Sequence, residues 1–413
     1  MKTLALTDFS LTLGNWGRAP LSINQQRQVL RTLANWAEKT GVVARAELYA
    51  RPAPQQSLIE EWISEKTSLE LTIREDPRSD RLKQLAKIGA TSVVIEVPTS
   101  VQTAIRRFRP KGIDIAAPYA ARAARDTVLA GLTPEIALVD VARAKKSDVL
   151  LIVDKVLEAI RPHDGIVRWR LVDSTGWADP IAGSRLPRSL PAWIRGLHSK
   201  FGIACESITV QCADTLGFAN ANTVAGAAAG ASTATSLFGL GMSCGWGATE
   251  VILAHMLDKD ANTKRLMGLR NVLISEDMVP LRACEQGSAT GSAPRDSHRP
   301  VSGPNAWQFP GGAAPEKPSD ELLDAHFPIP PKTLSRHDPE PLLTALSGHA
   351  GLLHLMHRQW PEQHFQSEDG RPLEISNAFQ AEFAEGRQIP VSWTELMPKV
   401  IASGVVDSGS VDS

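Results

Sequence analysis

Eight runs of apolar and β-branched residues alternate with stretches of helical periodicity along the first part of this 413-residue chain. A chain that leaves a strand through a helix returns beside it in parallel, so such alternation predicts a parallel sheet. Eight units are the pattern of a (β/α)8 TIM barrel, whose chemistry lies at the carboxyl ends of its strands. The runs are Leu4–Ser10, Ala44–Tyr49, Ser68–Arg74, Ser92–Val97, Glu135–Ala142, Ile166–Asp173, Ile208–Ala213 and Ser232–Phe238.

The composition of the sequence changes after the predicted barrel. Glycine, serine, proline and alanine accumulate, which is typical of a linker or a lid, and short amphipathic helices are expected at Leu342–Met356, Ile375–Ala384 and Trp393–Ile401. The sequence therefore predicts an α/β barrel followed by a mainly helical C-terminal accessory region. Its predicted parts are a barrel at 1–258, a linker or lid at 259–345, a helical subdomain at 346–403 and a disordered tail at 404–413.

Charge and cysteine content restrict the class of protein. A formal net charge of −1 argues against nucleic acid or a membrane surface as a partner. No apolar segment of the signal-peptide or membrane-spanning kind is present, and the four cysteines form no CxxC pair. We therefore expect a cytoplasmic protein with reduced thiols.

Two glycine-rich motifs near the end of the predicted barrel carry a family resemblance. The segment Gln211–Thr223 resembles the His-x-His-Asp/Asn-Asp-Leu-Gly-Leu-Ala-x-Ala-Asn signature of the homocitrate synthase, isopropylmalate synthase and HMG-CoA lyase family. Gly239-Leu240-Gly241, followed by Gly245 and Glu250, is similar to the Gly-Leu-Gly-Glu-Arg-x-Gly-Asn loop of that family. The nearest likeness is to the homocitrate synthases of nitrogenase-cofactor synthesis.

The resemblance implies a metal-dependent Claisen condensation. Family members remove a proton from acetyl-CoA, add the carbanion to a 2-oxo acid and hydrolyse the thioester. A divalent metal holds the oxo acid and stabilises the charge that develops on its carbonyl oxygen. Its ligands are an Asp at the first strand and two His on the seventh, which share one face because alternate residues of a strand point the same way.

This chain departs from the family at the positions that carry the chemistry. Neither Gln211 nor Ala213 is the histidine that the family has there, and Leu13 takes the place of the metal-binding Asp. Thr12 takes the place of the family's catalytic Arg, and Asn15 takes the place of an acidic residue. The resemblance therefore predicts a degenerate site with no metal, no cofactor and no catalytic residue. Further replacements are Ala142 for a site acid, Trp246 for the loop Asn and Phe309 for a histidine of the lid.

The histidines support the same prediction without any alignment. None of the ten lies at the carboxyl end of a predicted strand, so strand ends alone supply no histidine-based metal site. His349, His354 and His357 share helical spacing but have no acidic or cysteine partner close in sequence. We expect these three to be surface or interface residues.

Some groups that match the family's site remain. Arg74 ends the third predicted strand, Ser174 follows the sixth, and Asp214 and Asn222 belong to the Gln211–Thr223 motif. These four are the candidate residues for binding a small carboxylate. Helix capping or packing would explain Asp214 and Asn222 equally well.

Two functions from different classes follow. The first is a pseudoenzyme that acts as a scaffold, a partner subunit or a small-carboxylate binder. The second is an acyltransferase-related enzyme with a remodelled, metal-independent site that uses Arg74, Arg143, Ser174, Cys212 and Asp214, although strand alternation turns Cys212 away from the face of Gln211.

The expected partners follow from the same resemblance. They are a second copy or a related subunit, onto which residues 260–400 cross, and the possible ligands are a small carboxylate or an acyl-CoA.

Overall fold

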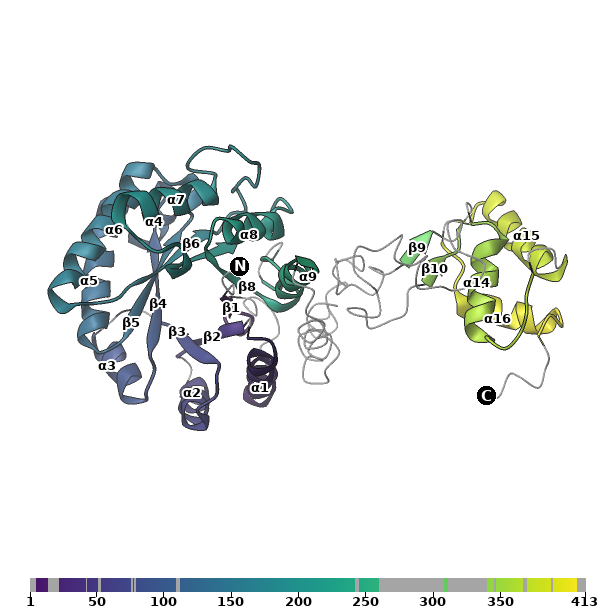
Figure 1. Ribbon diagram of the computed structural model, residues 1–413, viewed down its shortest axis with the longest axis horizontal. Helices are drawn as coiled ribbons and strands as arrows, with labels where there is room; N and C mark the ends of the chain where they lie inside the picture. Colours follow the sequence, from purple (N-terminus) through teal and green to yellow (C-terminus); the bar gives the residue numbers. More distant parts are fainter. Residues whose placement is uncertain are drawn as a thin grey trace. The chain divides into compact units, whose positions relative to one another are not determined.

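The structure is a computed structural model. The chain divides into two compact units, Met1–Arg295 and Asp296–Ser413. Figure 1 draws the described elements in colour. The structure describes residues 5–13, 22–41, 43–50, 53–75, 77, 79–108, 112–241, 245–259, 308–310, 340–344, 347–366, 370–387 and 389–406.

Eight parallel strands close into a barrel in the first unit (Figure 1). Each strand pairs with its neighbour in sequence, and β1 also pairs with β8 through Thr7 and Ala234, which closes the ring. The predicted (β/α)8 fold is therefore confirmed. The strands are β1 (Leu6–Asp8), β2 (Val43–Tyr49), β3 (Glu70–Arg74), β4 (Ser92–Pro98), β5 (Thr133–Val139), β6 (Arg168–Asp173), β7 (Ile208–Cys212) and β8 (Ser232–Thr235).

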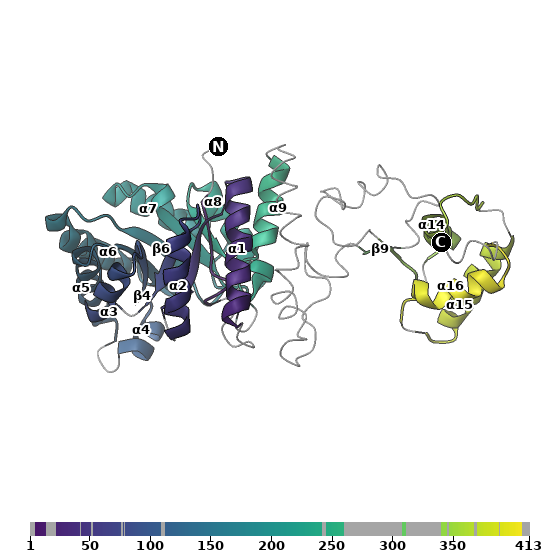
Figure 2. The same cartoon turned by 90° about the horizontal axis from the view of Figure 1, so that it is seen from below.

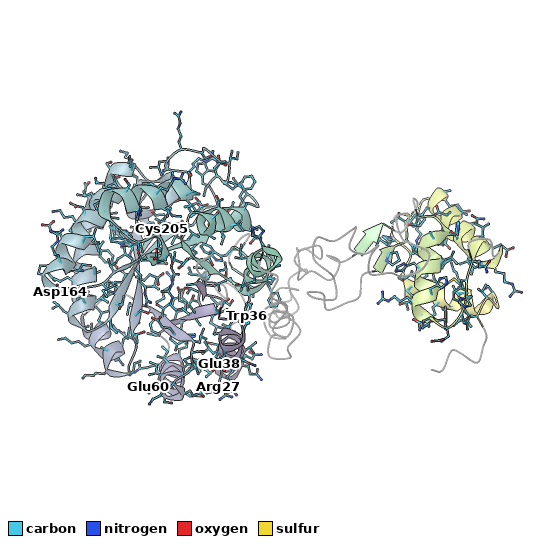
Figure 3. The ribbon with its side chains drawn as sticks, in the orientation of Figure 1. Arg27, Trp36, Glu38, Glu60, Asp164 and Cys205 are labelled. Carbon is cyan, nitrogen blue, oxygen red and sulfur yellow. The ribbon has the colours of Figure 1, made fainter. Side chains whose placement is uncertain are left out.

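Helices surround the strands on the outside of the barrel (Figure 2). Contacts between α1 and α2 include the ion pair of Arg27 and Glu61, with 2.6 Å from Nε to Oε1, and Figure 3 marks Arg27 and Glu60 on these outer helices. The helices are α1 (Ile23–Thr40), α2 (Ala53–Glu65), α3 (Ser79–Lys87), α4 (Val101–Phe108), α5 (Ala116–Leu129), α6 (Lys146–Ile160), α7 (Leu190–Phe201), α8 (Ala219–Ala228) and α9 (Thr249–Lys259).

Residues at both ends of α1 fix its limits. The Ser22 hydroxyl accepts from the Gln25 amide while the Gln25 side chain accepts from the Ser22 amide, so both groups cap the first turn. Gly41 ends the helix with φ of 64°, a left-handed conformation that a side chain disfavours. The apolar stripe of Val29, Leu33 and Trp36 is buried.

The alanine- and glycine-rich helix α8 packs unusually close to the sheet. A Cβ atom on Gly226 would lie 2.8 Å from both methyl groups of Val210 on β7, so only glycine fits at this contact. The helix begins at Ala219, whose amide donates to Asp214 Oδ1 at 2.9 Å.

Two predicted strands are shorter than their apolar runs. Strand β5 ends at Val139 because Asp140 is left-handed, with φ of 69°, and Val141–Arg143 forms a 3-10 turn. Strand β8 ends at Thr235, and Phe238 has φ of 55° within the turn Leu237–Gly239. In both cases a buried apolar run continues past the end of the strand, because the loop that follows is itself buried.

The second unit contains two short parallel strands and three helices. Leu342 belongs to β10, and α14 begins only at His349, so the helix predicted at Leu342–Met356 is wrong at its start. The elements are β9 (Gln308–Pro310), β10 (Glu340–Leu342), α14 (His349–Gln359), α15 (Gly370–Ala384) and α16 (Trp393–Ala402). Most of the predicted linker at 259–345 lies outside the described residues.

The histidines of α14 are part of an apolar core rather than the surface. His354 is 1% exposed and His357 is 7% exposed. The Nδ1 atom of His357 lies 3.0 Å from the Leu353 carbonyl oxygen. The imidazole of His357 packs edge-on against the Phe365 ring, with ring centroids 5.2 Å apart. A surface position was therefore wrong for His354 and His357, because helical spacing does not tell which face of a helix is covered, whereas His349 is half-buried. No helix in the described ranges is long and apolar enough to span a membrane.

Candidate functional site

Five charged side chains and one amide fill the middle of the barrel, where the strands turn alternate residues inward. All six residues are at most 7% exposed. We call them the interior ion cluster: Arg45 and Glu47 of β2, Arg74 of β3, Glu135 of β5, Arg170 of β6 and Gln211 of β7.

Glu47 is the centre of this cluster. Its Oε1 atom accepts from Arg74 Nε at 2.6 Å and from the Thr12 hydroxyl at 2.7 Å, and its Oε2 atom accepts from Arg170 Nη1 at 2.7 Å. Burial alone would raise the pKa of Glu47, but the two guanidinium charges and the hydrogen bonds outweigh it and lower the pKa to about 2. Glu47 is therefore a fully charged, fully paired carboxylate.

Arg170 connects Glu47 to the remaining members. Its Nε atom donates to Glu135 Oε1 at 2.6 Å, and Nη1 also donates to Gln211 Oε1 at 3.0 Å. Glu135 in turn lies 3.7 Å from Arg45, between Oε2 and Nη1. Because Arg170, Glu47 and Glu135 are wholly buried, each charge depends on its partners for the solvation that water would give.

The cluster reaches solvent at one edge of the barrel mouth. Arg74 Nη1 donates to Glu96 Oε1 at 2.5 Å, and the Glu96 side chain is 39% exposed. Burial raises the pKa of the neighbouring Tyr49 hydroxyl to about 12, so it stays protonated at neutral pH.

An aromatic plug lies one layer nearer the mouth than the ion cluster. The Trp246 indole meets Phe9 edge-on, with ring centroids 5.5 Å apart, and packs with Leu13 and Ala234 on the β1 and β8 side. It also packs against Val94, Ala137 and Val172 of β4, β5 and β6. Ala137 and Val172 follow Glu135 and Arg170 by two residues toward the carboxyl ends, so the indole crosses the mouth above the charges.

The backbone of the β8–α9 loop holds the plug in place. The Trp246 amide donates to the Gly239 carbonyl at 3.1 Å, and the Gly247 amide donates to the Cys212 carbonyl at 3.0 Å. A Cβ atom on Gly241 would lie 2.3 Å from Cδ1 of the indole. Gly241 is therefore required by the Trp246 ring itself.

The positions that hold a metal in the resembling family do not fit one here. Leu13 is 7% exposed within the aromatic plug, Ala213 has no donor atom, and the only side-chain oxygen of Gln211 accepts from Arg170. Thr12 bonds Glu47 and the Phe9 carbonyl, and Asn15 lies outside the described residues. Across the described ranges, no group of three His, Cys, Asp or Glu side chains is placed to hold a metal ion.

Asp8 is the acid that β1 retains, and it accepts a hydrogen bond from Thr249, the first residue of α9. Its Oδ1 atom accepts from the Ser10 amide at 2.9 Å, and its Oδ2 atom accepts from the Thr249 hydroxyl at 3.2 Å. Burial raises the pKa of Asp8 to about 6, although these hydrogen bonds oppose the rise. Since it neighbours the inward-facing Thr7, Asp8 points out of the barrel interior.

The four candidate binding residues are not brought to one point. Arg74 lies on β3 and is held by Glu47 and Glu96, whereas Ser174 and Asp214 lie in the loops after β6 and β7 and Asn222 lies in α8. Asn222 Nδ2 donates to the Ala178 carbonyl at 3.0 Å, Asp214 caps α8, and Ser174 is half-buried. Asp214 and Asn222 thus have structural roles in this chain, and a role in binding stays a prediction.

Arg143 and Cys212 are also committed elsewhere. Arg143 Nη2 donates to Asp140 Oδ2 at 2.6 Å, and Asp140 also accepts from Ser100 and Thr175, so one buried carboxylate ties three loops together. Cys212 is fully buried, and that burial raises the pKa of its thiol. Its turn away from the interior agrees with strand alternation.

Sequence reasoning missed the interior ion cluster, although a signal was present. Arg45 and Glu47, two residues apart, interrupt a run that is otherwise apolar, and Arg168 and Arg170 do the same on β6. Charges at alternate positions of a strand buried on both faces must meet partners inside the barrel. No local pattern tells which strands supply those partners.

Comparison with known proteins gives the following matches. The HMGL-like family model matches residues 17–273. A 2-phosphinomethylmalate synthase from Streptomyces hygroscopicus is 23% identical over 402 residues, which span 96% of this chain and 89% of that protein.

Two solved structures share the fold of the barrel. An HMG-CoA lyase from Acinetobacter baumannii, in complex with coenzyme A and 3-methylmalate, matches with a TM-score of 0.52 and 14% identity over 71% of this chain and 93% of that one. A hydroxymethylglutaryl-CoA lyase from Pseudomonas aeruginosa matches with a TM-score of 0.50 and 13% identity over 68% of this chain and 98% of that one.

Proposed function

This chain belongs to the HMGL-like family, and we propose from that premise that it is a member without the condensation chemistry. In this proposal the barrel is a scaffold that acts as a partner subunit or holds a small carboxylate at its rim, and it uses neither a metal nor another cofactor. A relative that aligns over 96% of this chain is a synthase, so the proposal is that this chain, and not the family, lacks the chemistry.

The aromatic plug is the observation that carries the proposal. In a TIM barrel the reacting groups of the substrate must come within reach of side chains at the carboxyl ends of the strands. Here the Trp246 indole packs against residues of β1, β4, β5, β6 and β8 at that level. A substrate bound there would have to displace a ring that six side chains contact.

The interior ion cluster supports the same function. An oxo acid or an enolate needs positive groups whose charge is available to it. In the interior ion cluster, Arg74 donates to Glu47 and Glu96, and Arg170 donates to Glu47, Glu135 and Gln211. A guanidinium that is already neutralised by a buried carboxylate adds little to the affinity for a carboxylate ligand.

A thiol-release assay tests the loss of chemistry. The purified chain is incubated with acetyl-CoA and 2-oxoglutarate, 2-oxoisovalerate or pyruvate, with and without Mn²⁺, Mg²⁺ or Zn²⁺. We expect release of free CoA at the rate without protein. Turnover above that rate would refute the proposal, and a parallel assay with an intact family member shows that the conditions support condensation.

A surface of exposed apolar side chains supports the role as a partner subunit. Trp177 and Ile181 lie in the β6–α7 loop and are 46% and 69% exposed, and Leu216 and Phe218 lie in the adjoining β7–α8 loop. Exposed apolar side chains gathered on neighbouring loops are typical of an interaction site. We expect a homodimer or a heteromer with a related subunit. Light scattering decides: a stable monomer at micromolar concentration, alone and with an active relative, would contradict it.

A second function has one observation in its favour. The synthase from Streptomyces hygroscopicus aligns over 96% of this chain, which makes an acyltransferase-related enzyme with a remodelled, metal-independent site the alternative. The same thiol-release assay distinguishes the two functions when it is run with a chelator. CoA release that survives the chelator and is lost in Arg74→Met would establish this alternative.

A further inference from the structure

Three successive residues at the end of β1 hold the loop between β8 and α9, which carries the aromatic plug. Asp8 Oδ2 accepts from the Thr249 hydroxyl at 3.2 Å, where the loop enters α9. Ser10 Oγ accepts from the Leu237 amide at 2.8 Å, just after β8 ends. Between these two, Phe9 meets the indole of the plug edge-on. Both ends of the loop and its indole are therefore fastened to one short segment of the chain.

The Asp8 carboxyl joins these anchors into one unit. Its Oδ1 atom accepts from the Ser10 amide at 2.9 Å, so the two residues that hold the ends of the loop also hold each other. The Thr249 hydroxyl lies 2.8 Å from the Thr235 hydroxyl, and the Thr249 amide donates to the Ser236 carbonyl at 3.0 Å. These five residues are at most 1% exposed. A change of charge at Asp8 therefore reaches both ends of the loop.

The backbone of the loop is held in a conformation that depends on its anchors. Phe238 has φ of 55°, which a bulky side chain rarely adopts, and its amide donates to Glu250 Oε2 at 2.8 Å. Gly245, next to Trp246, has φ of 84°. A strained residue such as Phe238 persists only while its surroundings hold it. Weaker anchors therefore favour a second, open arrangement of the loop.

Loss of the Asp8 proton weakens these anchors. An amide and a hydroxyl offset only part of the cost of burying its charge, and burial is the main cause that raises the pKa of Asp8. The charge of Glu47 on β2 raises this pKa further. On α9, Glu250 follows Thr249, and β8 presents the neutral hydroxyl of Thr235. The groups around Asp8 therefore suit its neutral form better than its charged form.

We propose that Asp8, Phe9 and Ser10 form a proton-controlled latch on the aromatic plug. The latch holds the indole over the barrel mouth while Asp8 is protonated, and it releases the β8–α9 loop when that proton passes to solvent. The mouth is therefore closed in acid and opens more often at neutral pH. The latch goes beyond the proposed function and does not depend on it, because it controls the plug whether or not the chain condenses acetyl-CoA.

Hydrogen exchange of the full chain, followed by mass spectrometry, measures this opening. The amides of Trp246 and Gly247 donate to the Gly239 and Cys212 carbonyls, so they exchange when the loop opens. Dividing each rate by the intrinsic rate at the same pH isolates the opening equilibrium. Burial raises the pKa of Asp8 to about 6 from the ordinary 3.8, so the protection of these amides should fall by roughly 20-fold between pH 4.5 and pH 7.

Urea distinguishes opening of the loop from unfolding of the barrel. Local opening exposes less surface than global unfolding does, so it depends less on denaturant. We expect the exchange of the loop amides to respond less to urea than the exchange of the amides of β5, which lies across the barrel from β1.

Three variants locate the effect. Asp8→Asn keeps a neutral side chain that accepts from the Ser10 amide, so the loop amides should lose their pH dependence. Asp154→Asn makes the same change on an exposed residue of α6 and should keep it. Should Asp8→Asn fail to fold, Ser10→Ala frees the Leu237 amide and leaves the Asp8 carboxyl in place. In Ser10→Ala the loop amides should exchange faster than in the wild type at every pH.

The outcomes are distinct from those of the thiol-release assay. Equal protection of the loop amides at pH 4.5 and pH 7 would overturn the latch, and so would a pH dependence that Asp8→Asn leaves intact. Loop amides that match the β5 amides in both rate and urea dependence would overturn it as well, because they would then exchange by global unfolding. Exchange in Ser10→Ala no faster than in the wild type would show that the loop is not held at this point.

Discussion

The two halves of the barrel interior have opposite chemistry. On the side of β2, β3, β5 and β6, charged residues remain, and each is neutralised by another side chain of the same chain. On the side of β1, β7 and β8, Leu13, Ala213 and Ala234 carry no polar side-chain group, and Trp246 packs over them. The family resemblance implies a metal bound from β1 and β7, where Leu13 and Ala213 offer no donor atom and Gln211 offers one oxygen.

Under the proposed function, the difference indicates how a barrel of this family can balance its interior without a metal. A dication can balance carboxylates that face the interior, so removing its ligands without other changes would leave buried charge unpaired. Here Gln211 accepts from Arg170, and Arg170 pairs with Glu47 and Glu135. The charged half is thus internally balanced by its ion pairs, and the indole of Trp246 packs over the apolar half.

Breaking the charged half should have the largest effect. Arg170→Met leaves Glu47 and Glu135 without their shared partner, and we expect a loss of about 3–5 kcal/mol in the free energy of unfolding. The matched control is Arg27→Met, which breaks the solvent-accessible pair with Glu61 between α1 and α2. Urea denaturation measures both. A cost for Arg170→Met no greater than that of the control would show that the cluster is not structurally essential.

The charged groups also differ in how they respond to pH. Asp8 has a folded-state pKa raised to about 6, above the ordinary 3.8, so the stability it contributes is present below that ordinary value and is lost as pH rises through 6. The loss is about 2–3 kcal/mol. We expect Asp8→Asn to flatten the stability profile between pH 4 and 6, measured by urea denaturation, relative to the wild type. An unchanged profile would contradict the assignment of this slope to Asp8.

Glu47 provides the contrast with Asp8. Its folded-state pKa is lowered to about 2, so its contribution is present above the ordinary value of 4.5 and is lost as pH falls toward 2. The same urea series, continued below pH 4.5, should therefore show stability falling with acid in both the wild type and Asp8→Asn.

Emptying the apolar half should have a smaller effect than breaking the charged half. Trp246→Ala removes a partly buried ring, and we expect a cost of about 2–3 kcal/mol, at or below the low end for a wholly buried tryptophan. Trp177→Ala, on a residue that is 46% exposed, should change stability by less than about 0.5 kcal/mol. If Trp246→Ala and Trp177→Ala lower the stability equally in thermal denaturation, the Trp246 indole does not fill the mouth.

The contact between Gly241 and Trp246 gives the smallest and most specific effect. Gly241→Ala should cost about 1–3 kcal/mol in the wild type, because its methyl group would meet the indole. In the Trp246→Ala background the same change should be nearly neutral. A double-mutant cycle measures this coupling, and additive effects would contradict the contact.

The fold was largely predictable because it depends on local signals. Strand–helix alternation gave the barrel, and Ser22, Gln25 and Gly41 gave the limits of α1. The errors fall where tertiary packing overrides the local pattern. Asp140 ends β5 inside an apolar run, and His354 is buried although its spacing resembles that of a surface residue.

The candidate site was less predictable than the fold. Strand alternation correctly placed Gln211 inward and Cys212 outward, but it did not show that Arg74 and Arg170 share Glu47. That pairing joins β2, β3 and β6. Whether two such side chains can reach each other depends on the interior space left by side chains of strands that are far apart in sequence. The indole of Trp246 is a similar case, since nothing near residue 246 indicates contacts with Val94 or Phe9.

Metal content is the most direct measurement of whether the side of β1 and β7 has lost its metal site. The full chain is expressed with added Zn²⁺, Mn²⁺ or Mg²⁺, dialysed and measured by elemental analysis, with an intact family member as the control. We expect no stoichiometric divalent metal in this chain, because Leu13, Gln211 and Ala213 offer a single oxygen and Arg170 already uses it. A stoichiometric metal that survives dialysis and is lost in Gln211→Ala would contradict this account.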